Sequence, residues 1–218
     1  MSMKNRHVLG EAVRHLILII LALYTLAPLL FLFVNAFKSN NEIIASPVAL
    51  PEHWTLQYIK TAMEAINFGK ALGLTFIITF FSILLLVIVS SFAAWAMVRS
   101  KTILSNIVFL CFTAAMLVPF QSLMYPLLSV FEKMGLKNVQ GLILMYGGFG
   151  LSMSVFLYHG FIKSVPASLE EAAVLDGANL FQMFFKVVFP LLKGTTVTVI
   201  VLNGMWIWND YLLPFLVI

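Results

Sequence analysis

Long apolar segments with few or no charged residues constrain the fold of this chain more than any other feature. A helix that crosses a bilayer needs about 20 predominantly apolar residues. Five segments provide this length, at Leu16–Phe37, within Ala71–Val98, within Thr102–Phe131, within Asn138–Ile162 and from Val187 to about Trp208. The composition agrees, because 61% of the 218 residues are hydrophobic and only 10% are charged, whereas soluble domains average about 25% charged residues. We therefore predict an all-α, polytopic transmembrane helical bundle.

The basic N-terminus and the distribution of lysine and arginine set the expected orientation. The first apolar segment is longer than the hydrophobic region of a signal peptide, which is about 7–15 residues, so we expect an uncleaved span. With the N-terminus in the cytoplasm, cytoplasmic segments hold eight Lys and Arg residues and outer segments hold five. The positive-inside rule favours that orientation. It predicts a cytoplasmic tail over residues 1–15, an outer loop over residues 38–70 and a cytoplasmic loop over residues 163–193.

The last residues of the sequence are apolar. Tyr211–Ile218 contains eight residues, which follow the polar pair Asn209 and Asp210. Eight residues are too few to cross a bilayer, for which about 20 are needed. We expect them to be the start of a sixth span whose remainder is missing from this sequence.

The stretch Lys163–Lys193 is the one long polar interruption in the second half of the chain. Ser168 and Glu171 have the spacing of a capping box, and Gly177 favours a left-handed helix exit. A second helix start is expected at Asn179. The pattern predicts a helix of about two turns, a glycine corner and another helix. Because so short a helix is marginal in water, it must dock on a partner surface or lie on lipid headgroups, and the spacing leaves both open.

The outer loop contains a second helical pattern. Leu56, Ile59, Met63 and Ile66 recur at helical spacing, and Gly69 is the expected helix stop. One interpretation is an amphipathic helix that lies on the outer membrane face. The other is a contact surface for an extracytoplasmic partner.

Polar residues inside the spans are costly and therefore informative. The candidate solute-path residues are Gln121, Asn203, Asn209 and Asp210. Pro119 and Pro126 flank the first of them and should bend the third span, which is one way to line a cavity. The alternative is that these side chains hydrogen-bond neighbouring helices, at about 0.6 kcal/mol per bond on average. Both roles stay open at this point.

The chain contains no motif for enzymatic chemistry. It has no phosphate-binding P-loop motif and no histidine or cysteine cluster with metal-ligand spacing. Glu170 and Glu171 are adjacent, so on a helix they point about 100° apart and cannot flank one substrate bond. We therefore expect no catalytic residue, no cofactor and no metal. The net charge of +4 is explained by basic residues at membrane edges and requires no nucleic acid.

Several segments, taken in order, resemble one protein family. Glu171-Ala172-Ala173, Asp176-Gly177-Ala178 and Pro190 resemble the EAA loop of bacterial ABC importer permeases. Val118-Pro119-Phe120-Gln121 and Trp208-Asn209-Asp210-Tyr211 are similar to segments of the maltose and multiple-sugar branch of that family. The resemblance implies the type I importer (MetI-like) permease fold, with residues 1–218 as a single permease domain that has five spans and the start of a sixth.

The resemblance also implies a function and a set of partners. It implies a multi-pass permease that imports a mono- or oligosaccharide across the bacterial cytoplasmic membrane, in contact with lipid. Its partners would be a second homologous permease subunit, an ABC ATPase dimer that hydrolyses ATP, and an extracytoplasmic sugar-binding protein. The implied ATPase-coupling residues are Glu170, Glu171, Ala172, Ala173, Asp176, Gly177 and Ala178.

Two other classes of membrane protein remain as alternatives. A secondary transporter or channel would need no ATPase, but its mark is a charged coupling site inside the spans, and here only Asp210 lies near a span edge. The other alternative is a membrane scaffold subunit without a solute path.

Overall fold

The computed structural model describes residues 3–218, and its described residues form helices without a strand. Met1 and Ser2, the first residues of the expected cytoplasmic tail, lie outside the described residues. The predicted all-α class is confirmed. The chain forms two compact units, Met1–Ala71 and Leu72–Ile218.

The first unit is built on the long helix α1 (Met3–Asn35). Its segment Gly10–Asn35 is long and apolar enough to cross a membrane, and none of that segment is buried by the rest of the chain. The turn after α1 folds back on the helix end, because the Asn35 amide donates to the Pro47 carbonyl at 3.0 Å. The Lys38 ammonium donates to the Ser46 carbonyl at 3.1 Å. These bonds fix the start of the predicted outer loop.

Two short helices follow in the segment of residues 38–70, the predicted outer loop: α2 (Asn40–Ala45) and α3 (Gln57–Ala65). The structure confirms the predicted helix in the second half of this loop, but not its predicted end at Gly69. The chain turns instead at Asn67, which has a φ of 48°, since Asn tolerates the left-handed region better than most residues. Gly69 already lies inside the next helix, α4 (Phe68–Ser100).

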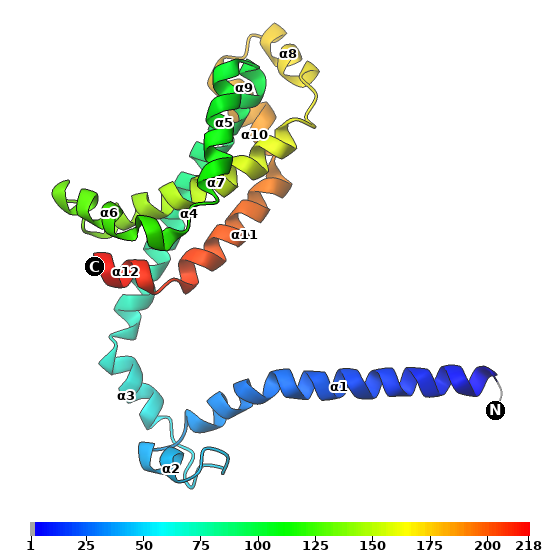
Figure 1. Cartoon of the computed structure of the whole chain (residues 1–218), viewed down its shortest axis with the longest axis vertical. Coiled ribbons are helices and arrows are strands. Elements are labelled where there is room, and N and C mark those ends of the chain that lie inside the picture. The colour runs from blue at the N-terminus through cyan, green and yellow to red at the C-terminus, as the bar shows by residue number, and fades with distance from the viewer. Residues whose placement is uncertain (1–2) are drawn as a thin grey trace. The chain divides into compact units, whose positions relative to one another are not determined.

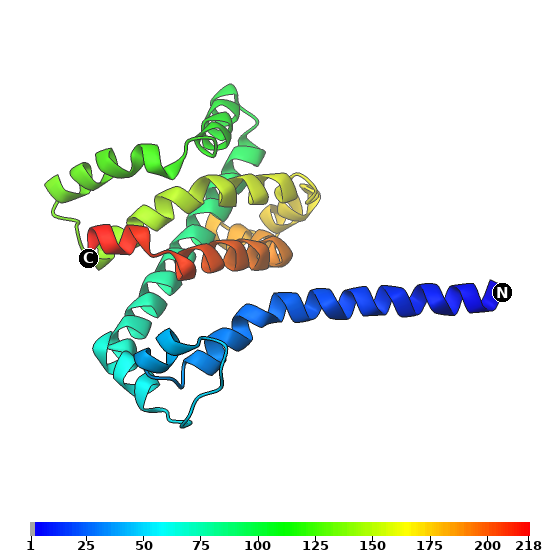
Figure 2. The same cartoon turned by 60° about the horizontal axis from the view of Figure 1, so that its bottom comes forward.

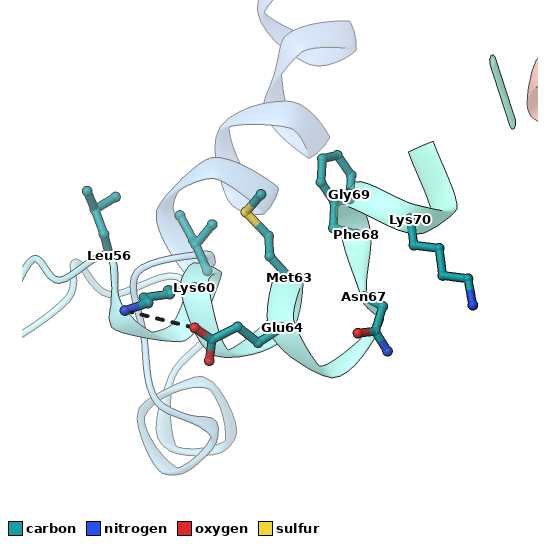
Figure 3. Close-up of a pocket in the computed structure, with 9 residues that line it drawn as sticks. Leu56, Lys60, Met63, Glu64, Asn67, Phe68, Gly69 and Lys70 are labelled. Atoms are coloured by element: carbon teal, nitrogen blue, oxygen red, sulfur yellow. Dashed lines mark ion pairs between the residues drawn. The ribbon is translucent and has the colours of Figure 1, made fainter. Parts of the chain in front are cut away.

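The corner between α3 and the start of α4 encloses an open groove of about 840 Å³, shown in Figure 3. Its lining is mixed: Leu56, Ile59, Lys60, Met63, Glu64, Asn67, Phe68, Gly69 and Lys70. Lys60 and Glu64 form an exposed ion pair at 3.9 Å on one rim. The groove lies on the loop for which the sequence left open a lipid-facing or a partner-facing role.

The second unit contains the rest of α4 and the remaining helices. They are α5 (Ile103–Ala115), α6 (Phe120–Lys133), α7 (Val139–Ile162), α8 (Ser168–Leu175), α9 (Leu180–Met183), the π-helix η1 (Phe184–Val188), α10 (Phe189–Leu191), α11 (Lys193–Asn209) and α12 (Leu212–Val217). Helix α7 lies in the middle of the unit and packs against α5, α11 and α12. Helices α8 and α12 lie at opposite ends of the unit (Figure 1).

Two of the five predicted spans are sharply bent. The third span breaks between α5 and α6, whose axes differ by 106°, and the bend forms the green corner in Figure 2. The break falls just before Pro119, whereas Pro126 lies inside α6 without ending it. The fifth span bends by 77° between α10 and α11, so its straight apolar helix begins at Lys193 rather than near Val187. The described residues contain three straight candidate spans, or up to five if each bent pair is one span.

The second unit has two hydrophobic cores. One joins the last turns of α4 and α7 to η1, with Trp95, Tyr158 and Phe184 among its buried residues. The other surrounds Tyr146 and Leu213 toward α12. The first core lies directly beneath the polar loop, so that loop is attached to a packed end of the bundle.

Candidate functional site

The polar loop of residues 163–193, called the coupling loop from here on, forms the predicted helix, glycine corner and helix. Helix α8 begins at Ser168 with Ala167 as its N-cap, and the N-cap makes no side-chain hydrogen bond. The predicted capping box at Ser168 and Glu171 is therefore wrong, since Ser168 is already helical. The acidic residues Glu170 and Glu171 in the first turn favour this helix end instead, because they offset the positive end of the helix dipole.

The glycine corner is formed as predicted. Gly177 has a φ of +80°, a conformation that residues with a β-carbon rarely adopt. The amide of Gly177 donates to the Val174 carbonyl at 3.0 Å, and the amide of Ala178 donates to the Ala173 carbonyl at 2.9 Å. These two bonds make a Schellman motif, which satisfies the last carbonyls of the helix.

The next helix begins with the predicted cap. The side chain of Asn179 accepts from the Gln182 amide at 2.9 Å, and the Gln182 side chain accepts from the Asn179 amide at 3.0 Å. This reciprocal pair is a capping box. It leads through α9 into η1, which buries Phe184 and Val188 in the core beneath the loop.

One face of α8 points into the bundle. Glu170 and Ala173, three residues apart, are both buried, and Glu170 is only 8% exposed. The Oε1 atom of Glu170 accepts a hydrogen bond from Nε of Arg99 at 2.8 Å and forms an ion pair with Nη2 of Arg99 at 2.7 Å. Its Oε2 atom accepts from Nε1 of Trp95 at 3.1 Å, and Arg99 Nη2 also donates to the Val165 carbonyl at 3.0 Å. We call Trp95, Arg99 and Glu170 the anchor cluster.

The anchor cluster rests on aromatic packing. The Trp95 ring lies 5.7 Å from that of Phe92 and 5.3 Å from that of Phe184, measured between centroids. Phe92 and Phe184 are 4.9 Å apart in an edge-to-face arrangement, a favourable geometry for aromatic pairs. The end of α4, the start of α8 and η1 are thus joined at one place.

The opposite face of α8 is exposed. Glu171, Ala172 and Leu175 lie on it, and Leu175 is 89% exposed. An apolar side chain so open to solvent, next to an alanine and a carboxylate, provides a small surface that a partner can cover. Figure 1 shows α8 at one end of the second unit.

The structure therefore divides the seven predicted coupling residues into two groups. Glu171, Ala172, Asp176 and Gly177 are exposed, and Ala178 is half-buried, whereas Glu170 and Ala173 face inward. Sequence reasoning missed Arg99 and Trp95 as members of this site. The contact between Arg99 and Glu170 joins residues that are 71 positions apart, so no local spacing in the sequence could predict it. The isolated charge of Arg99 at the end of an apolar segment was the available signal.

The four candidate solute-path residues make separate contacts. The buried amide of Asn203 donates to the Ser154 hydroxyl at 3.1 Å and to the Val199 carbonyl at 2.9 Å. Asp210 accepts from the Tyr146 hydroxyl at 2.8 Å. The remaining two, Gln121 and Asn209, are exposed. Within residues 3–218 no hydrogen bond joins any two of the four. The Asn203–Ser154 bond joins α11 to α7, whereas the bond to Val199 lies within α11.

These features define a class of protein, the apolar helical bundles with several candidate membrane spans and a short, exposed helix fixed to one end. Comparison with known proteins identifies the family. Residues 86–218 match the profile described as "Binding-protein-dependent transport system inner membrane component". The chain belongs to this family, which consists of transport permeases rather than enzymes.

Curated relatives extend over nearly the whole chain. The "Probable starch degradation products transport system permease protein AmyC" of Thermoanaerobacterium thermosulfurigenes is 46% identical, over 92% of this chain and 73% of its own length. The "Multiple sugar-binding transport system permease protein MsmG" of Streptococcus mutans is 32% identical, over 99% of this chain and 79% of its own length.

A solved structure gives the corresponding likeness of fold. It is described as a bacterial ABC transporter involved in the import of the acidic polysaccharide alginate. Its chain superposes with a TM-score of 0.80, over 97% of this chain and 74% of the other, at 24% identity. The predicted ABC importer permease fold is confirmed.

Proposed function

We propose that this chain is the permease subunit of an ABC importer that moves a mono- or oligosaccharide across the bacterial cytoplasmic membrane. The sugar class rests on the named relatives, whose printed descriptions refer to starch degradation products and to multiple sugars. The observation that carries the coupling role is the exposed face of α8, with Glu171, Ala172 and Leu175 directed away from the bundle.

In this proposal the ATPase is a separate chain that receives α8. The small side chain of Ala172 allows close approach of a partner surface, and the exposed Leu175 contributes apolar area. The carboxylate of Glu171 pairs with a basic group of the ATPase. Closure of an ATPase dimer then moves the docked helix, and the bundle follows as a rigid body.

The further partners follow from the membrane position. We propose that the N-terminus and the coupling loop are cytoplasmic and that residues 38–70 face the outside, where a sugar-binding protein delivers solute. A second, homologous permease completes the solute path. Lipid or that second permease covers the apolar surface of α1, of which the segment Gly10–Asn35 is unburied in this chain.

A substitution at the glycine corner tests the coupling role. Gly177→Leu places a side chain at a φ of +80°, so α8 can no longer leave its last turn in the observed direction. We expect sugar uptake to be lost while the subunit remains in the membrane at normal amounts. The matched control is Gly160→Leu, since Gly160 has ordinary helical backbone and also has no atom within 4 Å of an added β-carbon. Normal uptake by the Gly177 variant would show that α8 does not dock on a motor subunit.

The alternative, an ATPase-independent secondary transporter or channel, is tested by the partners themselves. An affinity-tagged chain purified from native membranes should bring down an ATPase and a second permease, and a binding protein should join when sugar is added. Uptake that persists after deletion of the copurifying ATPase would favour the alternative. Growth on single carbon sources, with and without this gene, identifies the sugar.

A further inference from the structure

We propose that the anchor cluster is the joint through which movement of the docked α8 reaches α4, and that Glu170 is a positioning residue rather than a docking residue. This inference rests on the proposed function, because it concerns how the motor's movement enters the bundle. It divides the paired acids of the coupling loop into one that faces the partner, Glu171, and one that holds the helix to its own subunit.

The hydrogen bonds of Glu170 leave little for an outside partner. Both carboxylate oxygens are engaged, one by two nitrogens of Arg99 and the other by the indole of Trp95. The residue is almost fully buried. The bond from Arg99 Nε to Glu170 is charge-assisted, and such hydrogen bonds are roughly twice as strong as those between neutral groups. An ATPase residue would have to displace Arg99 to reach this carboxylate.

The Arg99–Glu170 ion pair differs in kind from the other described ion pairs. Arg14 with Glu11 and Lys60 with Glu64 are neighbours on one helix, and their side chains are at least 65% exposed. Those of Arg99 and Glu170 are 23% and 10% exposed, and they join two helices. Exposed ion pairs contribute little to the stability of a protein. Loss of one partner of a buried pair is destabilising, because the other charge stays buried without a partner. Of the ion pairs among the described residues, only Arg99–Glu170 joins two helices and so resists their separation.

The anchor cluster acts on a helix that can carry the movement onward. Arg99 and Trp95 lie in the last turns of α4, and the same helix buries Ser90, Ser91 and Ala94 further along. Because α4 is continuous through these positions, a displacement of its end is also a displacement of its packed middle. The Arg99 bond to the Val165 carbonyl ties the segment before α8 to the same point. A pull on α8 therefore acts on α4 directly, and not only through the corner at Gly177.

A double-mutant cycle on the assembled importer tests this joint. The variants are Arg99→Gln, Glu170→Gln and the double variant, in membrane vesicles that contain the complete complex. The readout is the number of sugars transported per ATP hydrolysed. We expect each single variant to lower this ratio about tenfold, as reported for residues that carry coupling between sites. We expect the double variant to be no worse than either single, because both singles break the same interaction.

Controls separate a broken joint from a misfolded chain. Glu170→Asp keeps the carboxylate and should recover part of the ratio, and each variant must be present in the membrane with its ATPase still copurifying. Glu171→Gln serves as the comparison, since it should weaken ATPase copurification instead. An unchanged ratio in both single variants, or losses that multiply in the double variant, would overturn the inference. If the unmodified chain retained no ATPase, the proposed function itself would fail first.

Discussion

At the scale of single residues, adjacent side chains of the coupling loop have opposite tasks. Glu170 and Glu171 differ by one position, and consecutive helical residues point about 100° apart. The first is therefore buried against Arg99, while the second is exposed. Ala172 and Ala173 are divided in the same way, one outward and one inward. In the proposed function, the exposed face of α8 binds the ATPase, while the buried face holds the helix to its own subunit.

Asn203 provides a residue-scale prediction that separates helix bonding from solute contact. Its amide bonds to Ser154 and Val199, and its Oδ1 atom lies 2.6 Å from where a β-carbon on Gly150 would stand. Asn203→Ala should therefore destabilise the subunit by about 0.6 to 2 kcal/mol, the range found for hydrogen bonds between membrane helices. The measurement is the thermal unfolding of the purified subunit in detergent.

The control for this prediction is Asn209→Ala, because the Asn209 side chain is exposed and bonds only to its own helix at the Met205 carbonyl. It should leave the unfolding temperature unchanged. A variant of Asn203 that kept full stability but raised the sugar KM would assign this residue to the solute path instead.

At the scale of elements, short sequence patterns correctly predicted those turns and caps that depend on interactions between neighbouring residues. The glycine corner at Gly177 and the capping box at Asn179 follow from backbone geometry within a few residues, and both are present. The capping box at Ser168 failed because that helix begins one residue earlier than its pattern indicates. The predicted helix end at Gly69 is wrong, because the chain already turns at Asn67, which adopts the left-handed conformation.

The anchor cluster marks the limit of that kind of reasoning. The bonds of Glu170 reach Trp95 and Arg99, 75 and 71 positions away. Such contacts are set by how α4 and α7 pack, which no pattern within one segment contains. The bend of the third span was also predicted only in part. Pro119 and Pro126 predicted that this span bends. They did not predict that the break lies before Pro119 and that Pro126 lies within a continuous helix.

Helix α2 gives a prediction at the element scale that depends on pH. The Glu42 carboxylate accepts from the Ser39 amide at 2.7 Å and from the Glu52 amide at 3.3 Å. These bonds, the Ser39 amide first, hold the pKa of Glu42 below its usual value of 4.5. A lowered carboxyl pKa means that the cap is fully stabilising above pH 4.5 and is lost as the pH falls through the lower, folded-state pKa.

We therefore expect hydrogen exchange at the Ser39 and Glu52 amides, corrected for its intrinsic pH dependence, to lose protection as the pH falls below 4.5. The Glu42→Gln variant should show no such step, because its amide does not titrate. Equal pH profiles for the two proteins would mean that the carboxylate does not hold this turn.

At the scale of the whole molecule, much apolar surface remains uncovered by this chain. None of the candidate span in α1 is buried, and 22% of the corresponding span in α4 is. Gly69 and Gly73, which have a spacing typical of close helix packing, have no atom within 4 Å of an added β-carbon. In the proposed function, lipid and a second permease cover this apolar surface.

The topology of the whole chain is tested by labelling engineered cysteines. The Cys111→Ala background removes the native, exposed thiol. In it, His53→Cys places a thiol in the predicted outer loop, and Ala172→Cys places one on the exposed face of α8. Both positions are exposed. A membrane-impermeant maleimide should label position 53 in intact spheroplasts, and position 172 only after the membrane is opened. Position 172 should then be protected when the ATPase is bound, since the partner covers that face. Labelling of position 172 from outside would contradict both the orientation and the docking of α8, because an ATPase that uses cytoplasmic ATP could not reach it there.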